Sequence, residues 1–473
     1  MINKTKIIAT LGPSTSSKEM MRKMILKGVN VFRINFSHST HEEAQKIVDN
    51  TKEINKELSV HTAILADLQG PKIRVGKFEN PVILKKGAYI HFNTNINKTK
   101  DIFISYSRFP KDVKNGDKVL LDDGKISLQV KQTNKKNRVK LKVLFGGVLT
   151  SNKGVNLPNT NISLPCLTQK DKNDLQFILQ NKIEWIGLSF VRSAKDVRLL
   201  KTIIKKHKES KALVVAKIEK PEAISDIDNI ILSTDAIMVA RGDLGVEVPS
   251  HKVPVYQKMI VQKCINQSKP VLIATQMLES MTDNISATRA EINDVANSVI
   301  DGADAMMLSG ETSVGKHPLR AVDTMRKVIK DVEKSKHAIS KNTAERSLVV
   351  NKRYISNAIC ANACLISEKV GAKAIITATH SGYNTIKTSS YRPSAYIYAF
   401  TNNHTILNTL SLVWGVKAFY YDGGETTDQT VLETKKVLKK YKYVKKGDMV
   451  INIASMPAEE KGMTNMIKLS KVK

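Results

Sequence analysis

The chain has few cysteines and lacks long apolar runs. Only four of its 473 residues are cysteine, and none forms a CxxC pair: Cys166, Cys264, Cys360 and Cys364. This usage suits reduced thiols, so we expect a cytoplasmic protein without disulfides. No stretch approaches the ~18 consecutive apolar residues of a membrane span. Gly12-Pro13 also interrupts the amino-terminal segment before a signal peptide could form. We therefore expect no membrane partner.

Acidic and aromatic residues are also scarce. There are 44 acidic against 75 basic residues, which gives a net charge of +31, and aromatics make up 5%. Such a balance raises nucleic-acid binding as an alternative function. However, the lysines are scattered through predicted helices, as in 201–211 and 435–446, and no aromatic-interleaved patch, zinc spacing or recognition helix accompanies them. We therefore expect no nucleic-acid partner, and any binding that vanishes at moderate salt would be incidental.

Short apolar strands alternate with amphipathic helices through much of the chain. Polar residues repeatedly follow the carboxyl end of a strand, which is typical of a (β/α)8 TIM barrel with its site on that face. An open doubly wound sheet is the alternative, but no G-x-G-x-x-G follows the first strand. The eight predicted strands are Ile7–Leu11, Val31–Ile34, Ala63–Ala66, Trp185–Phe190, Leu213–Ala216, Ala236–Ala240, Val271–Ala274 and Ala305–Leu308.

Two segments of the chain have a different sequence pattern: one interrupts the alternation of strands and helices, and the other follows it. Short alternating runs with turn signals such as Asp123-Gly124 and Gly146-Gly147 predict an inserted small β-barrel. A polar linker is expected over residues 334–352, and helix and strand patterns after it predict a separate α/β domain. The expected division is barrel 1–70, inserted β domain 71–166, barrel 167–340 and C-terminal domain 341–473.

Charged residues end two neighbouring predicted strands. Lys217 and Glu219 follow one strand, and Arg241-Gly242-Asp243 follow the next. Strand alternation predicts that Lys217 and Glu219 point the same way, and likewise Arg241 and Asp243. Two carboxylates beside cations suit Mg²⁺ or Mn²⁺ holding phosphate oxygens, so we expect phosphoryl transfer. Gly242 would let the backbone approach an anion closely.

Two other patterns are weaker. The segment 310–317 nearly spells a phosphate-binding loop, but His317 stands where that loop needs Ser or Thr. His38, His41 and His61 have no partner at metal-ligand spacing, so we expect structural or solvent-facing roles.

Long segments of the chain resemble the pyruvate kinase family from end to end. They include Asn30-Val-Phe-Arg-Ile-Asn-Phe-Ser-His38, Val215-Ala-Lys-Ile-Glu219, Met238-Val-Ala-Arg-Gly-Asp-Leu-Gly245 and Ala274-Thr-Gln-Met-Leu-Glu-Ser-Met281. The resemblance implies a barrel, an inserted lid, a C-terminal domain and a homotetramer. It also implies phosphoryl transfer from phosphoenolpyruvate to ADP. A different barrel phosphotransferase acting on an enol or keto-acid phosphate is the alternative.

The family's site residues carry over by motif. The resemblance implies that Glu219 and Asp243 bind the divalent metal, while Lys217 stabilises the transition state. It implies that Arg33 binds phosphate and that Thr275, with Gly242 and Asp243, grips the substrate carboxylate. Thr275, or a water that it holds, is the candidate proton donor to the enolate. Arg74 and Lys153 resemble nucleotide-phosphate contacts, and lid closure would complete the site.

The monovalent-cation site departs from the commoner pattern. In many family members K⁺ is held by residues that match Asn35, Ser37, Asp67 and the Leu68 carbonyl, and a Glu stands where this chain has Lys72. The chain resembles the potassium-independent branch here, so we expect the Lys72 ammonium to replace K⁺.

Two segments near the carboxyl end of the chain bear on effector binding. The segment His380–Thr385 resembles a loop that binds a sugar-phosphate activator, but Glu459 and Glu460 in the later effector loop would repel phosphates. We therefore expect either another phosphorylated effector or none.

Overall fold

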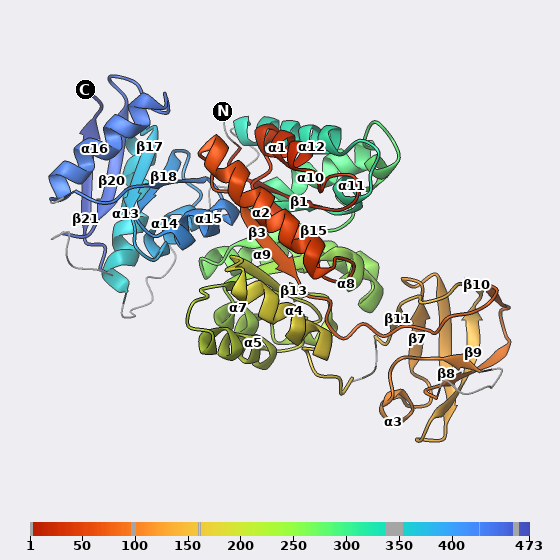
Figure 1. Cartoon of the computed structure of the whole chain (residues 1–473). Coiled ribbons are helices and arrows are strands. Elements are labelled where there is room, and N and C mark those ends of the chain that lie inside the picture. Colours follow the sequence, from red (N-terminus) through yellow and green to blue (C-terminus); the bar gives the residue numbers. More distant parts are fainter. Residues whose placement is uncertain are drawn as a thin grey trace.

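The computed structural model describes residues 3–95, 101–158, 160, 162–335, 353–424, 426–456 and 463–473. They form a central barrel with two further lobes on opposite sides of it (Figure 1). Glu459, Glu460 and most of the expected linker lie outside the described residues.

Eight parallel strands close the central barrel in the order β1-β16-β15-β14-β13-β12-β3-β2. Closure excludes the open doubly wound alternative and confirms the (β/α)8 prediction. Each strand lies where an apolar run predicted it, with ends shifted by up to two residues. The strands are β1 Lys6–Thr10, β2 Val31–Asn35, β3 Ala63–Asp67, β12 Trp185–Leu188, β13 Leu213–Ile218, β14 Ala236–Ala240, β15 Val271–Ala274 and β16 Ala305–Leu308.

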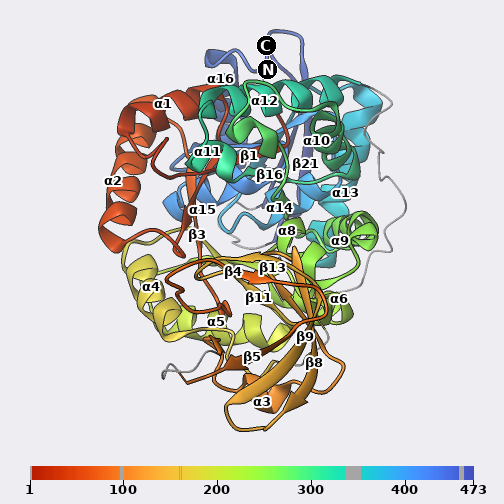
Figure 2. The same ribbon diagram turned by 90° about the vertical axis from the view of Figure 1, so that its right-hand side faces the viewer.

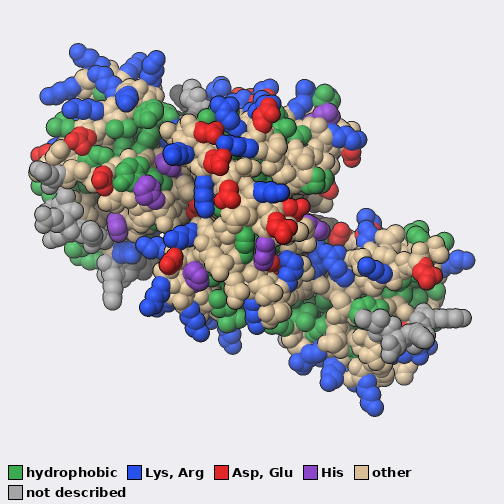
Figure 3. Space-filling view, in the orientation of Figure 1, with side chains coloured by type: hydrophobic (Ala, Val, Ile, Leu, Met, Phe, Trp, Pro, Cys, Tyr) green, Lys and Arg blue, Asp and Glu red, His purple; other side chains and the backbone are tan. Residues whose placement is uncertain are grey.

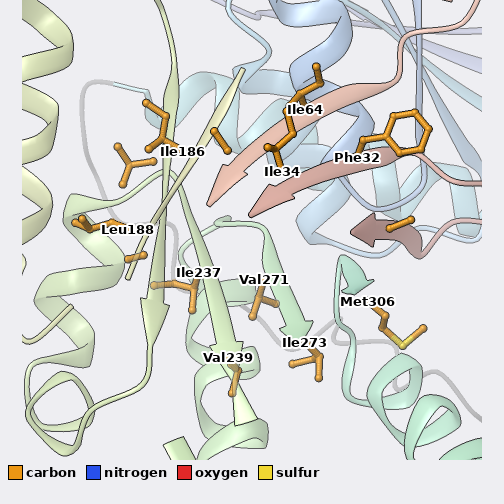
Figure 4. Close-up of a cluster of buried hydrophobic side chains, with 14 of the residues drawn as sticks. Phe32, Ile34, Ile64, Ile186, Leu188, Ile237, Val239, Val271, Ile273 and Met306 are labelled. Atoms are coloured by element: carbon orange, nitrogen blue, oxygen red, sulfur yellow. The ribbon is translucent and has the colours of Figure 1, made fainter. Parts of the chain in front are cut away.

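Alternate residues of these strands pack on opposite sides of the barrel wall. One set packs against the surrounding helices and includes Phe32, Ile34, Ile64, Ile237 and Val239 (Figure 4). The other set fills the barrel interior: Ile8, Val31, Ala63, Leu65, Trp185, Val215, Ala236, Met238, Leu272, Ala274, Ala305 and Met307. Polar residues that stand an even number of positions from an interior residue of the same strand therefore also face the barrel axis.

Helix boundaries follow local capping signals. The Ser17 side chain accepts a hydrogen bond from Met20 N, and the first helix ends at Gly28 with φ 113°. Thr168 and Asp171 form a reciprocal capping box although Asp is shorter than Glu. The barrel helices are α1 Lys18–Lys27, α2 His41–Leu58, α4 Gln169–Gln180, α5 Ala194–Lys206, α6 Pro221–Ser225, α7 Ile227–Ser233, α8 Arg241–Glu247, η1 Ser250–Lys252, α9 Val253–Asn266, η2 Glu279–Thr282, α10 Arg289–Asp301, α11 Gly310–Ser313 and α12 Pro318–Lys334.

The insertion after β3 is built almost entirely of strands. A six-stranded sheet has the order β11-β7-β8-β9-β5-β6, and β10 pairs with β4. The insertion projects from the barrel toward the viewer in Figure 2. Its elements are β4 Val82–Leu84, β5 Tyr89–Asn93, β6 Ile102–Phe103, α3 Phe109–Asp112, β7 Lys118–Leu121, β8 Ile126–Thr133, β9 Arg138–Phe145, β10 Gly147–Leu149 and β11 Val155–Asn156.

The C-terminal lobe is a five-stranded sheet covered by helices, in the order β19-β18-β17-β20-β21 with β21 antiparallel. Its Leu412 packs in the barrel-interior cluster, so this lobe closes the amino-terminal end of the barrel. Its elements are α13 Tyr354–Val370, β17 Ala374–Ala378, α14 Tyr383–Ser390, β18 Tyr396–Thr401, α15 His404–Thr409, η3 Leu410–Leu412, β19 Val416–Tyr420, α16 Thr427–Lys440, β20 Met449–Ala454 and β21 Met466–Lys471.

The cysteines and the helices bear on the absence of disulfides and of membrane spans that the sequence predicts. All four cysteines are buried and free, as predicted. Among the described helices, none combines the length and apolar character that crossing a membrane requires. Lys and Arg side chains are spread over all three lobes (Figure 3).

Candidate active site

A buried charge cluster lies at the carboxyl ends of β2, β3 and β13. Arg33 donates from Nε and Nη2 to Asp67 Oδ2 at 2.8 and 2.6 Å. Lys217 Nζ lies 3.0 Å from Asp67 Oδ1 and 2.9 Å from Glu219 Oε1. Because these side chains of β2, β3 and β13 all face the barrel interior, the fold brings together residues that are up to 186 positions apart, counting from Arg33 to Glu219. The prediction that Lys217 and Glu219 point the same way is confirmed.

Each member of the cluster stabilises the charge of another. Burial alone would raise the pKa of Asp67, but Lys217 and Arg33 hold it below its usual value. Burial likewise opposes charge on Lys217, whereas Asp67 and Glu219 raise its pKa. The pKa of Glu219 is raised by burial and by Asp243, against the lowering effect of Lys217. The cluster thus holds a fixed ammonium in a protein interior, where its field is strong.

Two residues that support this cluster were missed by the sequence analysis. Ser189 accepts a hydrogen bond from Lys217 Nζ at 2.8 Å and donates to the Leu68 carbonyl at 2.6 Å. Gly187 lies beside Asp67 in the sheet, and an added Cβ would come within 2.9 Å of Asp67 Oδ1. Both stand at alternate positions after Trp185, which fills the barrel interior, so strand alternation could have placed them on the interior side.

We expect Gly187→Ala to lower kcat by about 10²-fold, because the new methyl group would displace the Asp67 carboxylate and with it Arg33 and Lys217. Steady-state kinetics on folded variant protein would measure this. Wild-type kcat in the variant would contradict the interpretation, since it would show that Asp67 can move without consequence.

A second group of residues surrounds the start of α8. Gly242 N donates to Thr275 Oγ1 at 2.7 Å, and Thr275 Oγ1 donates to the Ala274 carbonyl at 2.6 Å. The Gly242 N–H expected to face an anion therefore already has a partner within the protein. An added Cβ at Gly242 would lie 3.2 Å from Thr275 Oγ1, a tight contact that the Thr275 side chain would have to shift to relieve.

The prediction that Arg241 and Asp243 point the same way along a strand is wrong. β14 ends at Ala240 and α8 begins at Arg241, so residues two apart diverge around a helix. Arg241 instead pairs with Asp294 at 2.6 Å and donates to the Thr275 carbonyl at 2.9 Å. Thr275 has φ 68°, a conformation uncommon outside glycine. Arg241 thus stabilises the strained turn that presents the Thr275 hydroxyl.

The expected monovalent-cation residues lie beside the charge cluster. Asn35 pairs with Asp67 in the sheet, and its side chain accepts from Ser37 N at 3.1 Å. Lys72 is exposed, and its ammonium makes no hydrogen bond or ion pair among the described residues. Its positive charge is nonetheless near His38, whose pKa is lowered by burial, Arg74, Lys72 and Arg33.

The connections to the insertion border a cleft. Arg74 Nη1 donates to the Asn152 carbonyl at 2.8 Å, and Val75 N donates to the Lys153 carbonyl at 3.0 Å. Lys153 Nζ pairs with Asp122 at 2.7 Å. The cleft between insertion and barrel is lined by residues of both, among them Lys72, Gly154, Asn156, Phe190, Lys220 and Asp243.

A buried ion pair of the barrel lies at this cleft, is joined by a residue of the insertion and was also missed. Lys220 Nζ donates to Glu247 Oε1 at 2.6 Å, and Asn156 of the insertion donates to the same oxygen at 2.8 Å. Arg192 adds hydrogen bonds to the carbonyls of Ile162 and Leu164 at 2.5 and 2.7 Å. Polar contacts therefore attach the insertion to the barrel at these points.

The other sequence patterns have structural roles. Segment 310–317 begins with the short helix α11, and Glu311 accepts backbone hydrogen bonds from Leu278 and Ser309 at 3.1 and 2.6 Å. His41 Nε2 lies 2.8 Å from Asp174 Oδ1 and stacks on Phe177. The His41 contacts agree with the structural role expected for it.

A closed (β/α)8 barrel with a buried charge cluster at the carboxyl ends of its strands is typical of barrel enzymes. Two family models match the chain: the pyruvate kinase barrel domain over residues 2–322, and the pyruvate kinase alpha/beta domain over residues 357–470. The chain belongs to the pyruvate kinase family. It is a phosphotransferase, transferring the phosphoryl group of phosphoenolpyruvate to ADP to give ATP and pyruvate in the last step of glycolysis.

Individual relatives agree over nearly the whole chain. Pyruvate kinase of Staphylococcus epidermidis is 39% identical over 472 residues, covering 99% of this chain and 80% of the relative. Pyruvate kinase 2 of Synechocystis is 40% identical over 476 residues, covering 99% and 79%. The crystal structure of a Cryptosporidium parvum pyruvate kinase matches with a TM-score of 0.91 at 34% identity, covering 100% of this chain and 96% of that one.

Proposed function

We propose that the buried cluster is the phosphoryl-transfer centre and that its arrangement defines the role of each residue. Lys217 stabilises charge on the transferring phosphoryl group, and Arg33 binds the phosphate of phosphoenolpyruvate. The observation that carries this proposal is the pair of cations held against Asp67 and Glu219 at the open end of the barrel. Phosphoryl transfer depends mainly on such prepositioned positive charge.

Glu219 and Asp243 are the two carboxylates proposed to hold a divalent cation. The two carboxylates are close enough for Asp243 to raise the pKa of Glu219. Within the described ranges no group of three His, Cys, Asp or Glu residues is arranged to hold a metal. Mg²⁺ is commonly held by one or two carboxylates with substrate phosphates and water as the other ligands. We therefore assign Glu219 and Asp243 as ligands of Mg²⁺ or Mn²⁺, which would neutralise phosphate charge.

Gly242, Asp243 and Thr275 are proposed to hold the substrate carboxylate. The Thr275 hydroxyl now donates to Ala274 and accepts from Gly242. To protonate the enolate, directly or through a water, this hydroxyl would have to turn away from the Ala274 carbonyl. While the Thr275 hydroxyl donates to the Ala274 carbonyl at 2.6 Å, its proton is not available to the enolate. We therefore propose that substrate binding turns the hydroxyl before the proton is transferred.

Arg74 and Lys153 are proposed to contact the nucleotide phosphates. Both belong to the connections between barrel and insertion, and Lys153 now pairs with Asp122. We propose that residues 71–166 act as a lid on a barrel made of 1–70 and 167–340, with 341–473 as a separate domain. Exchange of Asp122 for phosphate at Lys153 would accompany lid closure and exclude water.

The enzyme is expected to turn over without K⁺. Lys72 carries an exposed ammonium without a partner among the described residues, and it is close enough to His38, the chain neighbour of Ser37, to lower the pKa of His38. Pyruvate formation from phosphoenolpyruvate, ADP and Mg²⁺ should proceed at comparable rates with and without K⁺. Turnover only with K⁺ would refute the role of Lys72, and no turnover in either case would point to another enol-phosphate substrate.

A substitution at Lys72 tests its role in K⁺ independence directly. Lys72→Glu is expected to make turnover depend on K⁺. The variant loses the ammonium that would replace K⁺, and the new carboxylate adds a negative charge that a bound cation would have to balance. Lys77→Glu is the matched control: it has the same charge change on an exposed lysine of the insertion outside the cleft lining. The control should keep the wild-type response to K⁺.

We further propose a cytoplasmic homotetramer that uses neither nucleic acid nor membrane as a partner. The pocket of the C-terminal lobe, lined by Arg353, His380, Ser381 and Thr464 among others, is the proposed place for a phosphorylated effector. Sedimentation would test the assembly, and titration of sugar phosphates against the phosphoenolpyruvate saturation curve would test regulation.

A further inference from the structure

One buried carboxylate of the barrel is the meeting point of three separate parts of the chain. Glu247 is the last residue of α8, and its side chain is 1% exposed. Its Oε1 accepts from Lys220 Nζ at 2.6 Å and from Asn156 Nδ2 at 2.8 Å. Its Oε2 is also buried and has no hydrogen-bond partner among the described residues. Lys220 follows β13 and Asn156 belongs to β11 of the insertion, so these three residues form a junction, the Glu247 junction, between barrel and insertion.

The barrel half of the Glu247 junction connects the two carboxylates proposed as metal ligands. Lys220 is the chain neighbour of Glu219. Glu247 stands one helical turn after Asp243, on the same face of α8. Lys220 Nζ also lies 5.9 Å from the centre of the Phe190 ring, and Phe190 N donates to Glu219 Oε2 at 2.7 Å. The Lys220–Glu247 ion pair therefore ties the end of β13 to α8 beside both proposed ligands, where outer groups orient the ligands of a metal.

The insertion half of the Glu247 junction connects α8 to a proposed nucleotide contact. Asn156 lies on β11, which pairs with β7, and Lys153 precedes β11 by two residues. A turn of the insertion also reaches α8, because a Cβ built on Gly124 would lie 3.8 Å from Val246 Cγ1. Figure 1 shows α8 on the side of the barrel that faces the insertion. The insertion is therefore seated against the helix that carries Asp243.

We propose that Glu247 is a positioning residue for phosphoryl transfer, which aligns the nucleotide contacts with the metal ligands through Asn156 and Lys220. This inference rests on the function proposed above for Glu219 and Asp243. A carboxylate suits the task because one oxygen accepts from donors on two different elements, and burial strengthens both hydrogen bonds. When the insertion moves away with Asn156, Lys220 still holds Glu247. The lid can then open while the metal ligands keep their places.

Asn156→Ala tests the insertion half without a change of charge. It removes the hydrogen bond to Glu247 and keeps the ion pair of the barrel. We expect the KM for ADP to rise about tenfold, the effect of losing one hydrogen bond to a charged group. The affinity for Mn²⁺ alone, measured by electron paramagnetic resonance on the full chain, should stay at the wild-type value. Asn93→Ala is the matched control, since Asn93 donates to Asp101 at 3.3 Å within the insertion. The control should keep the wild-type KM for ADP.

The double variant Lys220→Met/Glu247→Gln tests the barrel half and keeps the net charge. It removes the ion pair beside the proposed ligands, and we expect Mn²⁺ binding to weaken by about tenfold or more, as for other groups that orient metal ligands. The matched control is Lys201→Met/Asp235→Asn, which removes a 2.7 Å ion pair between α5 and the amino end of β14. This control should bind Mn²⁺ as wild type does. Thermal unfolding of both double variants separates a loss of fold from a loss of metal affinity.

The outcomes separate this inference from the function on which it rests. Wild-type Mn²⁺ affinity in Asp243→Asn would overturn the proposed metal ligands, and the barrel half of the junction with them. Weak binding in Asp243→Asn but wild-type affinity in the double variant would overturn the positioning role alone. An unchanged KM for ADP in Asn156→Ala, or an equal rise in Asn93→Ala, would overturn the link to the insertion. Weaker Mn²⁺ binding in the double variant and a higher KM in Asn156→Ala, with both controls unchanged, would support the inference.

Discussion

Replacing Lys217 by methionine is expected to lower kcat by roughly 10³–10⁵-fold, the range found when a positioned cation is removed from phosphoryl-transfer enzymes. Methionine fills a similar volume but cannot oppose the charge of the transferring group. Lys217 is nearly buried, and its ammonium is held by Asp67, Glu219 and Ser189 within 3.0 Å. No other lysine of the described structure contacts Asp67, so none can take over its place.

Two further variants show whether the loss is chemical. Lys201→Met removes a lysine whose ammonium lies 2.7 Å from Asp235 on the helical layer, away from the centre, and kcat should stay near wild type. Lys217→Arg keeps the charge but cannot copy the compact ammonium, so partial activity is expected. Circular dichroism and metal binding should show that Lys217→Met is folded. Retention of kcat within about tenfold in Lys217→Met would remove this residue from the mechanism.

Asp304→Asn is expected to lower the free energy of unfolding by about 3–5 kcal/mol, the usual cost of leaving one partner of a buried ion pair unpaired. Asp304 precedes β16 of the barrel and pairs with Arg392 of the C-terminal lobe at 2.8 Å, with side chains 3% and 4% exposed. Asp304 also accepts from Trp414 N and Val271 N at 3.1 and 3.0 Å. The change should therefore loosen the contact between barrel and C-terminal lobe.

Urea unfolding followed by far-ultraviolet circular dichroism and by activity would measure this effect. The control is Asp331→Asn, whose side chain is 78% exposed and lies 3.9 Å from Lys334. An exposed pair of this kind contributes about 0–1 kcal/mol, so its midpoint should barely move. Equal midpoints for the two variants would show that the buried pair does not hold the lobes together.

Local patterns in the sequence determined the architecture of the barrel. Eight apolar runs were enough to place its strands, because strands buried on both faces need uninterrupted apolar residues. The caps at Ser17 and Thr168 are equally local, since their hydrogen bonds involve residues only three positions away. The polar residues after each strand indicated which end of the barrel carries the chemistry. Parity along β13 also predicted correctly that Lys217 and Glu219 lie on one side.

The tertiary structure decided which of these residues meet. The start of α8 at Arg241 could not be predicted, because a strand and a helix can both follow Ala240, and the contacts with Asp294 and the Thr275 carbonyl favour the helix. Gly187 and Ser189 have unremarkable local sequence, and their importance comes from Asp67 on the neighbouring strand. The ion pair between Asp304 and Arg392 likewise joins residues 88 positions apart. Electrostatic and packing energies depend on distance in space, so these features exist only once the barrel has closed and the C-terminal lobe lies against it.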